Sequence, residues 1–253
     1  MRIFALSDIH VDYEVNARWI ADLSTADYCG DLLILAGDVT DAPSLFERCI
    51  TDLAKRFRQV LFVPGNHDLW VVRDSRKRHS LEKFDDLGRI VRSSGASMLP
   101  FHEGSVSIIP LFGWYDYSFG SPGNELRSSW MDYYACRWPD GIHDKEVAEH
   151  FEALNTERLR VTGRTTITFS HFLPRIDLMP AGIPPSKRYL YPILGTTKLE
   201  RQLRRANASL HVYGHSHVNR RKEIDGVTYV NNAFGYPSET RIAAKKLLEV
   251  YEF

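Results

Sequence analysis

The sequence predicts an α/β protein built on parallel strands, because short apolar runs of strand length alternate with segments of helical periodicity. The runs of strand length cover residues 2–7, 32–36, 60–63, 105–111, 166–170, 210–213, 227–230 and 247–251. Parallel strands need a crossover connection, which is usually a helix, so the alternation in the first 100 residues indicates parallel pairing there. The C-terminal part is richer in strand than in helix.

Four segments are expected to be helical. Residues 43–57 carry apolar side chains at helical spacing, with a proline in the first turn and basic residues at the end, where they suit the helix dipole. Residues 144–160 repeat this spacing, with Asp144 as the expected N-cap. Residues 197–200 match a capping box that opens a short basic helix, and residues 74–91 are also expected to be helical.

No linker, low-complexity tract or fixed-period repeat divides the chain, so we expect a single domain over residues 1–253. Two stretches are irregular: an aromatic loop at residues 113–141 and a Pro-rich loop at residues 172–195. Long loops in a compact domain are often functional, so both are expected to serve as substrate or partner elements. For the aromatic loop, packing into the core is the alternative.

The composition limits the class of protein. The 32 Lys+Arg residues balance 32 Asp+Glu residues, which argues against a protein that coats nucleic acid through a basic excess. Cys29, Cys49 and Cys136 are too far apart in the sequence to indicate a disulfide framework or a Cys-x-x-Cys metal site. Asp8 lies too early for a signal peptide, and no apolar run reaches the roughly 20 residues that span a bilayer. We therefore expect a cytoplasmic protein without a membrane partner.

The histidines carry the main functional signal, because five of the ten follow predicted strands in short polar clusters. The clusters are Asp8-Ile9-His10, Gly37-Asp38, Gly65-Asn66-His67-Asp68, Ser170-His171 and Gly214-His215-Ser216-His217. In an open α/β sheet, ligand sites gather at the carboxyl ends of parallel strands, so the five clusters are expected to converge in space. The other five histidines are expected to take no part in catalysis; they are His79, His102, His143, His150 and His211.

The residue types in these clusters indicate a metal centre. Apart from His67 and Asp68, they supply two aspartates, four histidines and an asparagine, which are nitrogen and oxygen donors without a thiolate. Such a set suits divalent ions such as Mn²⁺, Fe²⁺ or Zn²⁺. Seven ligands fit two ions that share a bridging carboxylate, ~3.5–4 Å apart, the arrangement that serves phosphoryl transfer. A single Asp-x-His would usually be a solvated turn, but packing does not create five such clusters in order.

The five ordered clusters resemble those of the calcineurin-like metallophosphoesterase superfamily, in its small bacterial type. The resemblance spans residues 8–217 and implies a four-layer α/β/β/α sandwich that holds two divalent ions, Mn²⁺ or Fe²⁺/Fe³⁺, with Zn²⁺ as the alternative. It assigns the ligands as follows: Asp8, His10 and His217 hold the first ion, Asn66, His171 and His215 hold the second, and Asp38 bridges them.

The same resemblance implies a reaction, in which a hydroxide held between the ions attacks the phosphorus of a small phosphodiester or phosphomonoester. His67 would lie at the entrance, placed to stabilise the transition state or to protonate the leaving oxygen. Asp41 matches a position that hydrogen-bonds this histidine, although an acid is also favourable so near the helix that begins at Pro43. Asp68 is expected to support its loop.

Differences between this sequence and the motifs of particular subfamilies limit the class of substrate. The segment Gly37-Asp38-Val39-Thr40-Asp41-Ala42-Pro43 lacks the phosphate-clamping arginine of the protein Ser/Thr phosphatases, so a protein phosphatase is not expected. A nuclease of the same superfamily remains an alternative, although the chain has no basic excess and no accessory segment. A non-catalytic metal-binding scaffold is the alternative from a different class, and the retention of every ligand position argues against it.

Candidate residues for substrate binding can be named only because they lie near a predicted ligand in the sequence. The Pro-rich loop starts directly after His171, so Lys187 and Arg188 within it are candidates for binding a second phosphate or an acidic partner surface. A basic run at residues 73–78 is a solvated helix face or, less commonly, a phosphate site. The expected partner is a phosphorylated small molecule or a phosphodiester; a carrier-protein substrate stays open, and extended nucleic acid is not expected.

Overall fold

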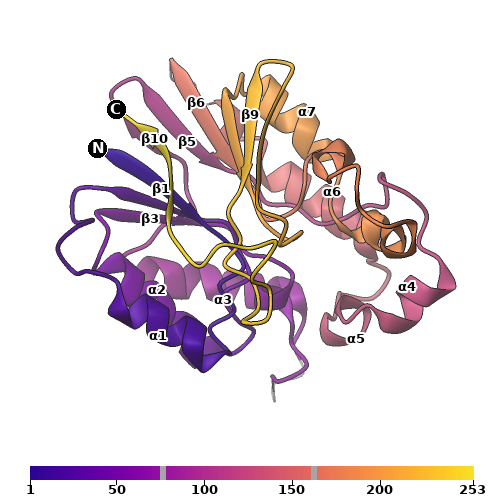
Figure 1. Cartoon of the computed structure of the whole chain (residues 1–253). Helices are drawn as coiled ribbons and strands as arrows, with labels where there is room; N and C mark the ends of the chain where they lie inside the picture. The colour runs from indigo at the N-terminus through magenta and orange to yellow at the C-terminus, as the bar shows by residue number, and fades with distance from the viewer. Residues whose placement is uncertain (75–77, 161–163) are drawn as a thin grey trace.

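The computed structural model describes residues 1–74, 78–160 and 164–253. Within these residues two β-sheets lie between two groups of helices, which is the α/β/β/α sandwich that the family resemblance implies (Figure 1). Helices α1, α2 and α3 pack side by side on one side of the molecule. Helices α6 and α7 contact each other on the other side, where Lys198 Nζ pairs with Glu152 at 2.7 Å.

The first sheet has the strand order β10-β1-β2-β3. Its strands are β10 (Leu248–Glu252), β1 (Arg2–Leu6), β2 (Leu32–Leu35) and β3 (Gln59–Phe62). The three N-terminal strands are parallel, as predicted, and β10 pairs antiparallel with β1. Every residue of β2 is buried, because both faces of a parallel sheet are covered.

The second sheet has the strand order β4-β5-β6-β7-β9-β8. Its strands are β4 (Phe101–Glu103), β5 (Val106–Pro110), β6 (Thr165–Phe169), β7 (Leu210–Tyr213), β9 (Val227–Asn231) and β8 (Arg220–Ile224). The inner four strands are parallel, so their carboxyl ends meet at one edge. All eight predicted strands are present, with ends shifted by at most one residue.

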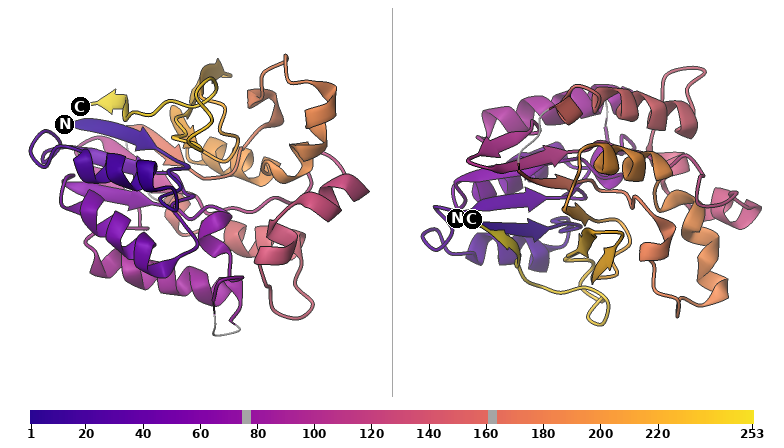
Figure 2. Two further views of the ribbon diagram at one scale, coloured as in Figure 1. Left: turned by 60° about the horizontal axis from the view of Figure 1, so that its bottom comes forward. Right: turned by 90° about the horizontal axis from the view of Figure 1, so that it is seen from above.

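The helices link these strands (Figure 2). The α-helices are α1 (Glu14–Asp22), α2 (Pro43–Ala54), α3 (Ser80–Ser93), α4 (Asn124–Ser129), α5 (Asp132–Ala135), α6 (Asp144–Leu154) and α7 (Thr197–Arg205). Single or extended 3₁₀ turns are η1 (His67–Leu69), η2 (Arg158–Arg160), η3 (Ile176–Leu178) and η4 (Pro185–Ile193). Helix α2 buries Phe46, Cys49, Ile50 and Leu53, as its periodicity predicts.

Two predicted helix ends need correction. Helix α6 stops at Leu154 rather than at residue 160, because Asn155 turns its buried amide onto Phe112 and exchanges two hydrogen bonds with its backbone, of 2.8 and 2.9 Å. The second case is α2, which ends at Ala54 rather than at residue 57. There Arg56 donates to the carbonyl of Asp52 at 2.7 Å, the role expected of a basic residue at a helix C-terminus.

Three predicted helix starts also need correction. The N-cap of α6 is His143, one residue before Asp144, and its backbone N–H donates to Glu146 at 3.0 Å. Similarly, α7 is capped by Thr196, whose hydroxyl accepts from the N–H of Lys198 at 3.1 Å. Helix α3 begins at Ser80 rather than at residue 74, and residues 75–77 of that prediction lie outside the described residues.

The strands that the sequence analysis missed lie at the two edges of the second sheet. Strand β8 reads Arg-Arg-Lys-Glu-Ile, so it has no apolar run, and β4 has only three residues. Charged side chains are common on edge strands because they oppose pairing with another chain. Helix α1 was missed for a related reason: it buries only Asn16 and Ile20, one of which is polar.

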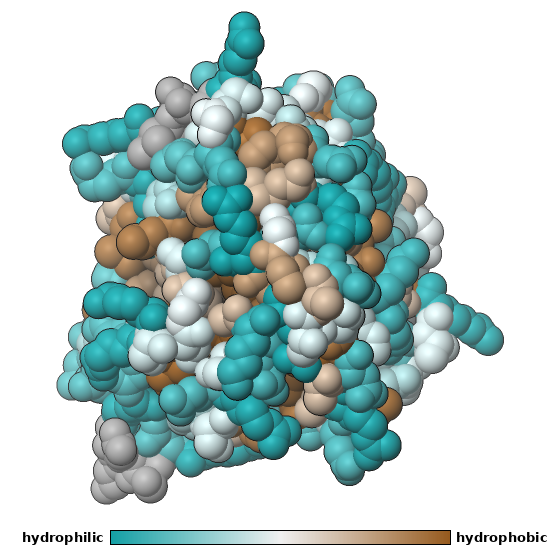
Figure 3. Space-filling model, turned by 90° about the vertical axis from the view of Figure 1, so that its left-hand side faces the viewer, coloured by the Kyte–Doolittle hydropathy of each residue, from teal (hydrophilic) through white to brown (hydrophobic). Residues whose placement is uncertain are grey.

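The side of the molecule where both termini lie is mostly hydrophilic, with apolar residues in small separate patches (Figure 3). None of the described helices is both long enough and apolar enough to cross a membrane.

Candidate metal centre

The five polar clusters converge at the carboxyl ends of the strands, as the sequence predicts. Asp8 and His10 follow β1, Asp38 follows β2, and Asn66 and His67 follow β3. From the second sheet, His171 follows β6, and His215 and His217 follow β7. All of these side chains are buried except that of His67, which is 19% exposed.

The backbone at this edge is strained. Five of the eight clustered residues have a positive φ, between 42° and 66°: Asp8, His10, Asp38, His215 and His217. A non-glycine residue in this conformation costs on the order of 1–3 kcal/mol, and such residues concentrate at functional sites. The strain turns the chain sharply after each strand and brings the side chains together.

Two glycines make the close approach possible. A Cβ at Gly65 would lie 2.1 Å from Oδ1 of Asp38 and 2.7 Å from the ring of His171. Gly37 has a φ of 84°, and a Cβ there would lie 2.6 Å from Nδ1 of His171. A side chain at either position would therefore collide with Asp38 or His171, which explains why both residues are glycine.

The side chains form two groups that share Asp38. One group contains Asp8, His10, Asp38 and His217, and the other contains Asp38, His171 and His215. Within each group, one donor atom from every residue lies within 4.8 Å of the others. Asn66 joins the second group, because its amide oxygen lies 3.2 Å from Nε2 of His171.

In the second group, main-chain carbonyls fix the imidazole rings. Nδ1 of His171 donates to the carbonyl of Ala36 at 2.9 Å, and Nε2 of His215 donates to the carbonyl of Ile193 at 3.0 Å. The other ring nitrogens of these two histidines face each other at 3.1 Å. A hydrogen bond of this kind sets the tautomer, and it leaves both facing nitrogens with a lone pair for a metal.

In the first group, a carboxylate fixes the ring of His217. Nδ1 of His217 lies 2.6 Å from Oε2 of Glu239, and its Nε2 lies 3.2 Å from Oδ1 of Asp8. Metal-ligating histidines often have such a carboxylate partner. Glu239 was not predicted. It lies eight residues after the end of β9, in the segment Gly235-Tyr236-Pro237-Ser238-Glu239, so the rule that found the clusters directly after strands does not reach it.

The electrostatics of the cluster favour a bound cation. Burial lowers the pKa of His10 to about 3 and lowers that of His171, so both rings are neutral and have free lone pairs. Burial, together with the charges of Asp8 and Asp68, raises the pKa of Asp38 well above its ordinary value. Buried carboxylates in such close company need compensation, and a divalent ion provides it.

Asp68 supports the loops, as expected. Its carboxylate accepts from four backbone N–H groups, those of Asp38, Val39, Thr40 and Gly65, at distances between 2.8 and 3.1 Å. The loops after β2 and β3 are therefore fastened to one side chain, which keeps Asp38 and Asn66 in register.

His67 lies beside the two groups, at a cavity of about 260 Å³. Its Nε2 is 3.9 Å from Oδ2 of Asp38, and its ring stacks on Trp70 with centroids 3.7 Å apart. Tyr236 lines the same cavity, with its ring 4.6 Å from that of His10. The partial exposure of His67 fits the expected place at the entrance.

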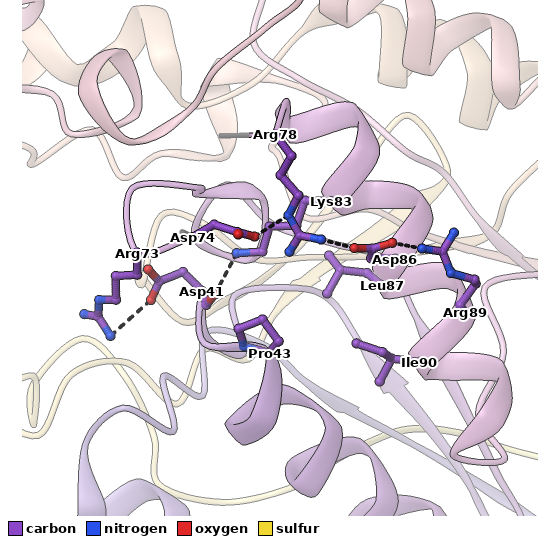
Figure 4. Close-up of a pocket in the computed structure, with 10 residues that line it drawn as sticks. All are labelled: Asp41, Pro43, Arg73, Asp74, Arg78, Lys83, Asp86, Leu87, Arg89 and Ile90. Carbon is purple, nitrogen blue, oxygen red and sulfur yellow. Dashed lines mark hydrogen bonds and ion pairs between the residues drawn. The ribbon is translucent and has the colours of Figure 1, made fainter. Parts of the chain in front are cut away.

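Asp41 lines the same cavity as His67, but among the described residues it pairs with Arg73, whose Nη1 is 3.3 Å from Oδ1 of Asp41. Its backbone carbonyl accepts from Nζ of Lys83 at 2.7 Å. Figure 4 shows these contacts in an adjacent cavity of about 460 Å³. There Arg78 lies between Asp74 and Asp86, so its charge is neutralised by acids.

The basic run at residues 73–78 thus forms ion pairs where it is described, and Arg76 and Lys77 lie outside the described residues. Lys187 and Arg188 are exposed on η4. The guanidinium of Arg188 donates to the carbonyls of Ala181 and Ile183, at 3.3 and 3.1 Å, and so turns onto its own loop.

Some side chains of the aromatic loop pack in the core, and others lie beside the candidate centre. Trp114 and Tyr115 are fully buried in the core, which is the alternative that the sequence left open. Trp130 instead meets the ring of His215 edge-on, with centroids 6.0 Å apart. Asp132, which was not predicted, accepts from Nδ2 of Asn66 at 2.9 Å. An acid among aromatic residues was its only sequence signal.

The other five histidines lie outside the cluster, as expected. His211 is buried in β7, where its ring nitrogens contact the hydroxyls of Thr168 and Ser170 at 2.8 and 3.1 Å. Burial lowers its pKa to about 3. The ring of His102 contacts Ser107 in the strand pair β4–β5. The ten histidines thus separate into five that converge at the candidate centre and five that lie elsewhere.

The arrangement of donors matches a known family. The sequence profile of the family described as calcineurin-like phosphoesterase matches residues 1–219. The chain belongs to this family. Calcineurin-like phosphoesterases are hydrolases of phosphoester bonds, and the buried Asp/His cluster described above suits a divalent metal.

Two comparisons with individual proteins agree with this family, and a third shows the fold alone. The [Acyl-carrier-protein] phosphodiesterase PptH of Mycobacterium tuberculosis is 28% identical over 94% of this chain and 79% of its own length. The crystal structure of phosphopantetheinyl hydrolase PptH from the same organism superposes with a TM-score of 0.84 and 26% identity, over 98% of this chain and 95% of that chain. A Plasmodium protein, GAP50, shares the fold alone, with a TM-score of 0.51 and 11% identity over 99% of this chain and 75% of its own.

Proposed function

We propose that this chain hydrolyses the phosphodiester that links a phosphopantetheinyl group to an acyl carrier protein, using two divalent ions, Mn²⁺ or Fe²⁺/Fe³⁺. The observation that carries the two-ion part is the sharing of Asp38 by two buried groups of donors. The substrate class is supported by the similarity to a relative named as an acyl-carrier-protein phosphodiesterase. We propose residues 1–253 as a single catalytic domain, since β1 and β10, from the two ends of the chain, pair in one sheet.

The residues around the cluster fit this metal content. Asp8, His10 and His217 would hold the first ion, Asn66, His171 and His215 the second, and Asp38 both. The donors are nitrogen and oxygen atoms without a thiolate, which suits Mn²⁺ and iron. The hydrogen bonds from His171 and His215 to main-chain carbonyls leave one nitrogen of each ring free to coordinate.

Two bound divalent ions would supply about four positive charges, which activate water and neutralise the phosphate. In the hydrolysis a water oxygen would join phosphorus, the bond from phosphorus to the carrier oxygen would break, and the water would lose one proton to the solvent. His67 is placed to give its proton to this leaving oxygen. The products are a phosphopantetheine monoester and a carrier with a free hydroxyl.

His67 needs an acidic partner for this role, because burial lowers the pKa of its imidazole well below the ordinary value. Asp41 is the candidate. Its Oδ2 is buried and has no hydrogen-bond partner among the described residues, and it lines the same cavity as His67. A hydrogen bond from His67 to this oxygen would favour the protonated imidazole.

The carrier would approach over the Pro-rich loop. Lys187 and Arg188 are exposed on η4, and Ile193, at the end of the same 3₁₀ segment, accepts from His215. The η4 segment therefore connects the surface to the cluster. An acidic carrier surface would meet two cations there.

The test uses two substrates with the protein loaded with Mn²⁺. Bis-p-nitrophenyl phosphate should be hydrolysed, and a phosphopantetheinylated carrier protein should lose its prosthetic group, as measured by intact mass. No turnover with any divalent metal would overturn the enzyme mechanism. Cleavage of the small diester without release from the carrier would overturn the substrate alone, and cleavage of p-nitrophenyl phosphate only would indicate a monoesterase.

A further inference from the structure

Asp132 is a buried carboxylate outside the predicted ligand set that accepts from three side-chain donors, two from the segment after β3 and one from its own aromatic loop. It is only 2% exposed and lies at the start of α5, in the aromatic loop. Its Oδ1 accepts from Nδ2 of Asn66 at 2.9 Å and from Nε1 of Trp70 at 2.7 Å. Its Oδ2 accepts from Nε1 of Trp130 at 2.7 Å.

Each of the three donors also lies against a histidine of the candidate centre. The amide of Asn66 carries its oxygen 3.2 Å from Nε2 of His171. The indole of Trp70 stacks on His67. The indole of Trp130 borders the ring of His215.

The hydrogen bond to Asn66 has a directional consequence. An amide can present either its oxygen or its nitrogen to a neighbour, and only the oxygen is a metal ligand. Because Asp132 is an acceptor, it takes the NH₂ end of the amide. The oxygen must then point the other way, toward the second group of donors.

We infer that Asp132 is a positioning residue, which fixes the amide oxygen of Asn66 toward the second metal ion and holds the Trp70 ring under His67. This inference rests on the proposed two-metal function. The aromatic loop contains none of the predicted ligands. Through Asp132 it would nevertheless set the geometry of the second ion and not that of the first. Glu239 performs the corresponding task for His217 in the first group.

Asp144 shows what a purely structural carboxylate in this region looks like. It accepts from Nε1 of Trp114 at 2.9 Å and from the hydroxyl of Tyr117. Like Asp132, it joins aromatic residues of the same loop. Its described hydrogen bonds are to these aromatic side chains and to none of the eight clustered residues, so it is a matched control.

The test compares Asp132→Ala with Asp144→Ala and the wild type. Each protein is titrated with Mn²⁺, the number of bound ions is counted, and the spin coupling between Mn²⁺ ions is read by electron paramagnetic resonance. Loss of an outer partner of a ligand weakens metal binding by about 10–100-fold. Asp132→Ala should therefore weaken one of two ions by this factor and replace the coupled spectrum by that of a single Mn²⁺.

The Asp144→Ala protein should keep two coupled ions even if its unfolding temperature falls. Asp132→Asn provides a second variant, because an amide keeps the shape and one acceptor oxygen but presents N–H groups to one of the three donors. It should lower the affinity for the same ion by a smaller factor. Two coupled ions of unchanged affinity in Asp132→Ala would overturn the inference. A wild type that binds fewer than two ions would instead overturn the proposed function on which the inference rests.

Discussion

The two donor groups that share Asp38 are held by different means. In the second group, backbone carbonyls of Ala36 and Ile193 fix His171 and His215. In the first group, the charged carboxylate of Glu239 fixes His217. Despite burial, the carboxylates of Asp8 and Glu239 raise the pKa of His217 to about 10, whereas burial lowers that of His215 well below its ordinary value.

This difference has a physical consequence. A ring fixed by backbone carbonyls stays in place as long as the sheet is folded, because its partners belong to the strands and loops themselves. A ring fixed by a side chain depends on one residue that mutation can remove. The first ion should therefore respond to side-chain substitutions around His217, and the second should respond to substitutions around Asn66.

The largest effect is expected at the residue common to both groups. Asp38→Asn should remove both ions, because the neutral amide lacks the charge that two cations need. Activity on bis-p-nitrophenyl phosphate should fall by more than about 10³-fold, since one oxyanion donor alone is worth about 10²–10³-fold. Metal content and turnover are the measurements.

The control is Asp31→Asn, which alters a buried acid at the opposite, amino end of β2 that pairs with Arg2 at 2.6 Å, away from the cluster. It should retain both ions. Retention of one tightly bound ion by Asp38→Asn would show that the two groups are independent and that Asp38 does not bridge them.

Substitution of His67 distinguishes an effect on catalysis from an effect on metal binding. His67→Ala should keep two ions per chain, because the ring lies 3.9 Å from Asp38 and belongs to neither group of donors. The kcat for a substrate with a poor leaving group, such as the carrier diester, should fall by about 10²–10⁴-fold, the usual contribution of a general acid. The kcat for bis-p-nitrophenyl phosphate should fall less, since its leaving group needs little protonation.

Replacement of the exposed His150 by Ala on α6 serves as the control and should change neither substrate. Loss of both ions in His67→Ala would show that His67 is a ligand. An equal fall of kcat on the two substrates would contradict its role as a proton donor.

Glu239 tests the first group alone. Glu239→Gln removes the charge that holds His217, so the affinity for the first ion should fall by about 10–100-fold while the second ion stays bound. Titration with Mn²⁺ and electron paramagnetic resonance measure both. Glu249→Gln, a change at an exposed acid of β10, should leave both affinities unchanged.

Glu239→Gln and Asp132→Ala can also be combined in one chain. If each supports a different ion, the two affinity losses should be independent, and the double variant should show both. Weakening of the same ion by both substitutions would mean that the division into two groups is wrong.

The sequence predicts the fold and the cluster well for one physical reason. Buried parallel strands must be continuous apolar runs, and the polar residues directly after them lie at one edge of the sheet. That rule locates Asp8, Asp38 and His171 without any knowledge of distances. It does not reach Glu239, which lies eight residues after the end of β9 and meets His217 only through the fold.

Other features could not be predicted by this rule. Strand β8 is charged throughout its exposed positions, because an edge strand needs no apolar run. Asp132 lies in a loop between helices, and its role depends on meeting Asn66, which is 66 residues away in the chain. No periodicity records such a contact, since tertiary packing alone brings the two side chains together.

The smallest effect is expected on the surface, far from either group. Replacing Lys187 and Arg188 together by Ala should raise the KM for the carrier diester by about 2–5-fold, because each exposed ion pair contributes only about 0.2–1 kcal/mol. The KM for bis-p-nitrophenyl phosphate should not change, since that substrate reaches no further than the cluster. The effect on the carrier should also shrink as salt is raised, because exposed charges are screened.

Lys145 on α6 and Arg201 on α7 are exposed cations that provide a matched double replacement away from η4. If both double variants raise the KM for the carrier equally, the carrier responds to net charge and not to a defined surface. An unchanged KM in the Lys187 and Arg188 variant would place the carrier elsewhere. A rise confined to that variant, and to low salt, would extend the difference between buried and exposed parts of the site to the substrate: the buried donors decide which bond is cleaved, and the exposed cations of η4 decide which carrier presents it.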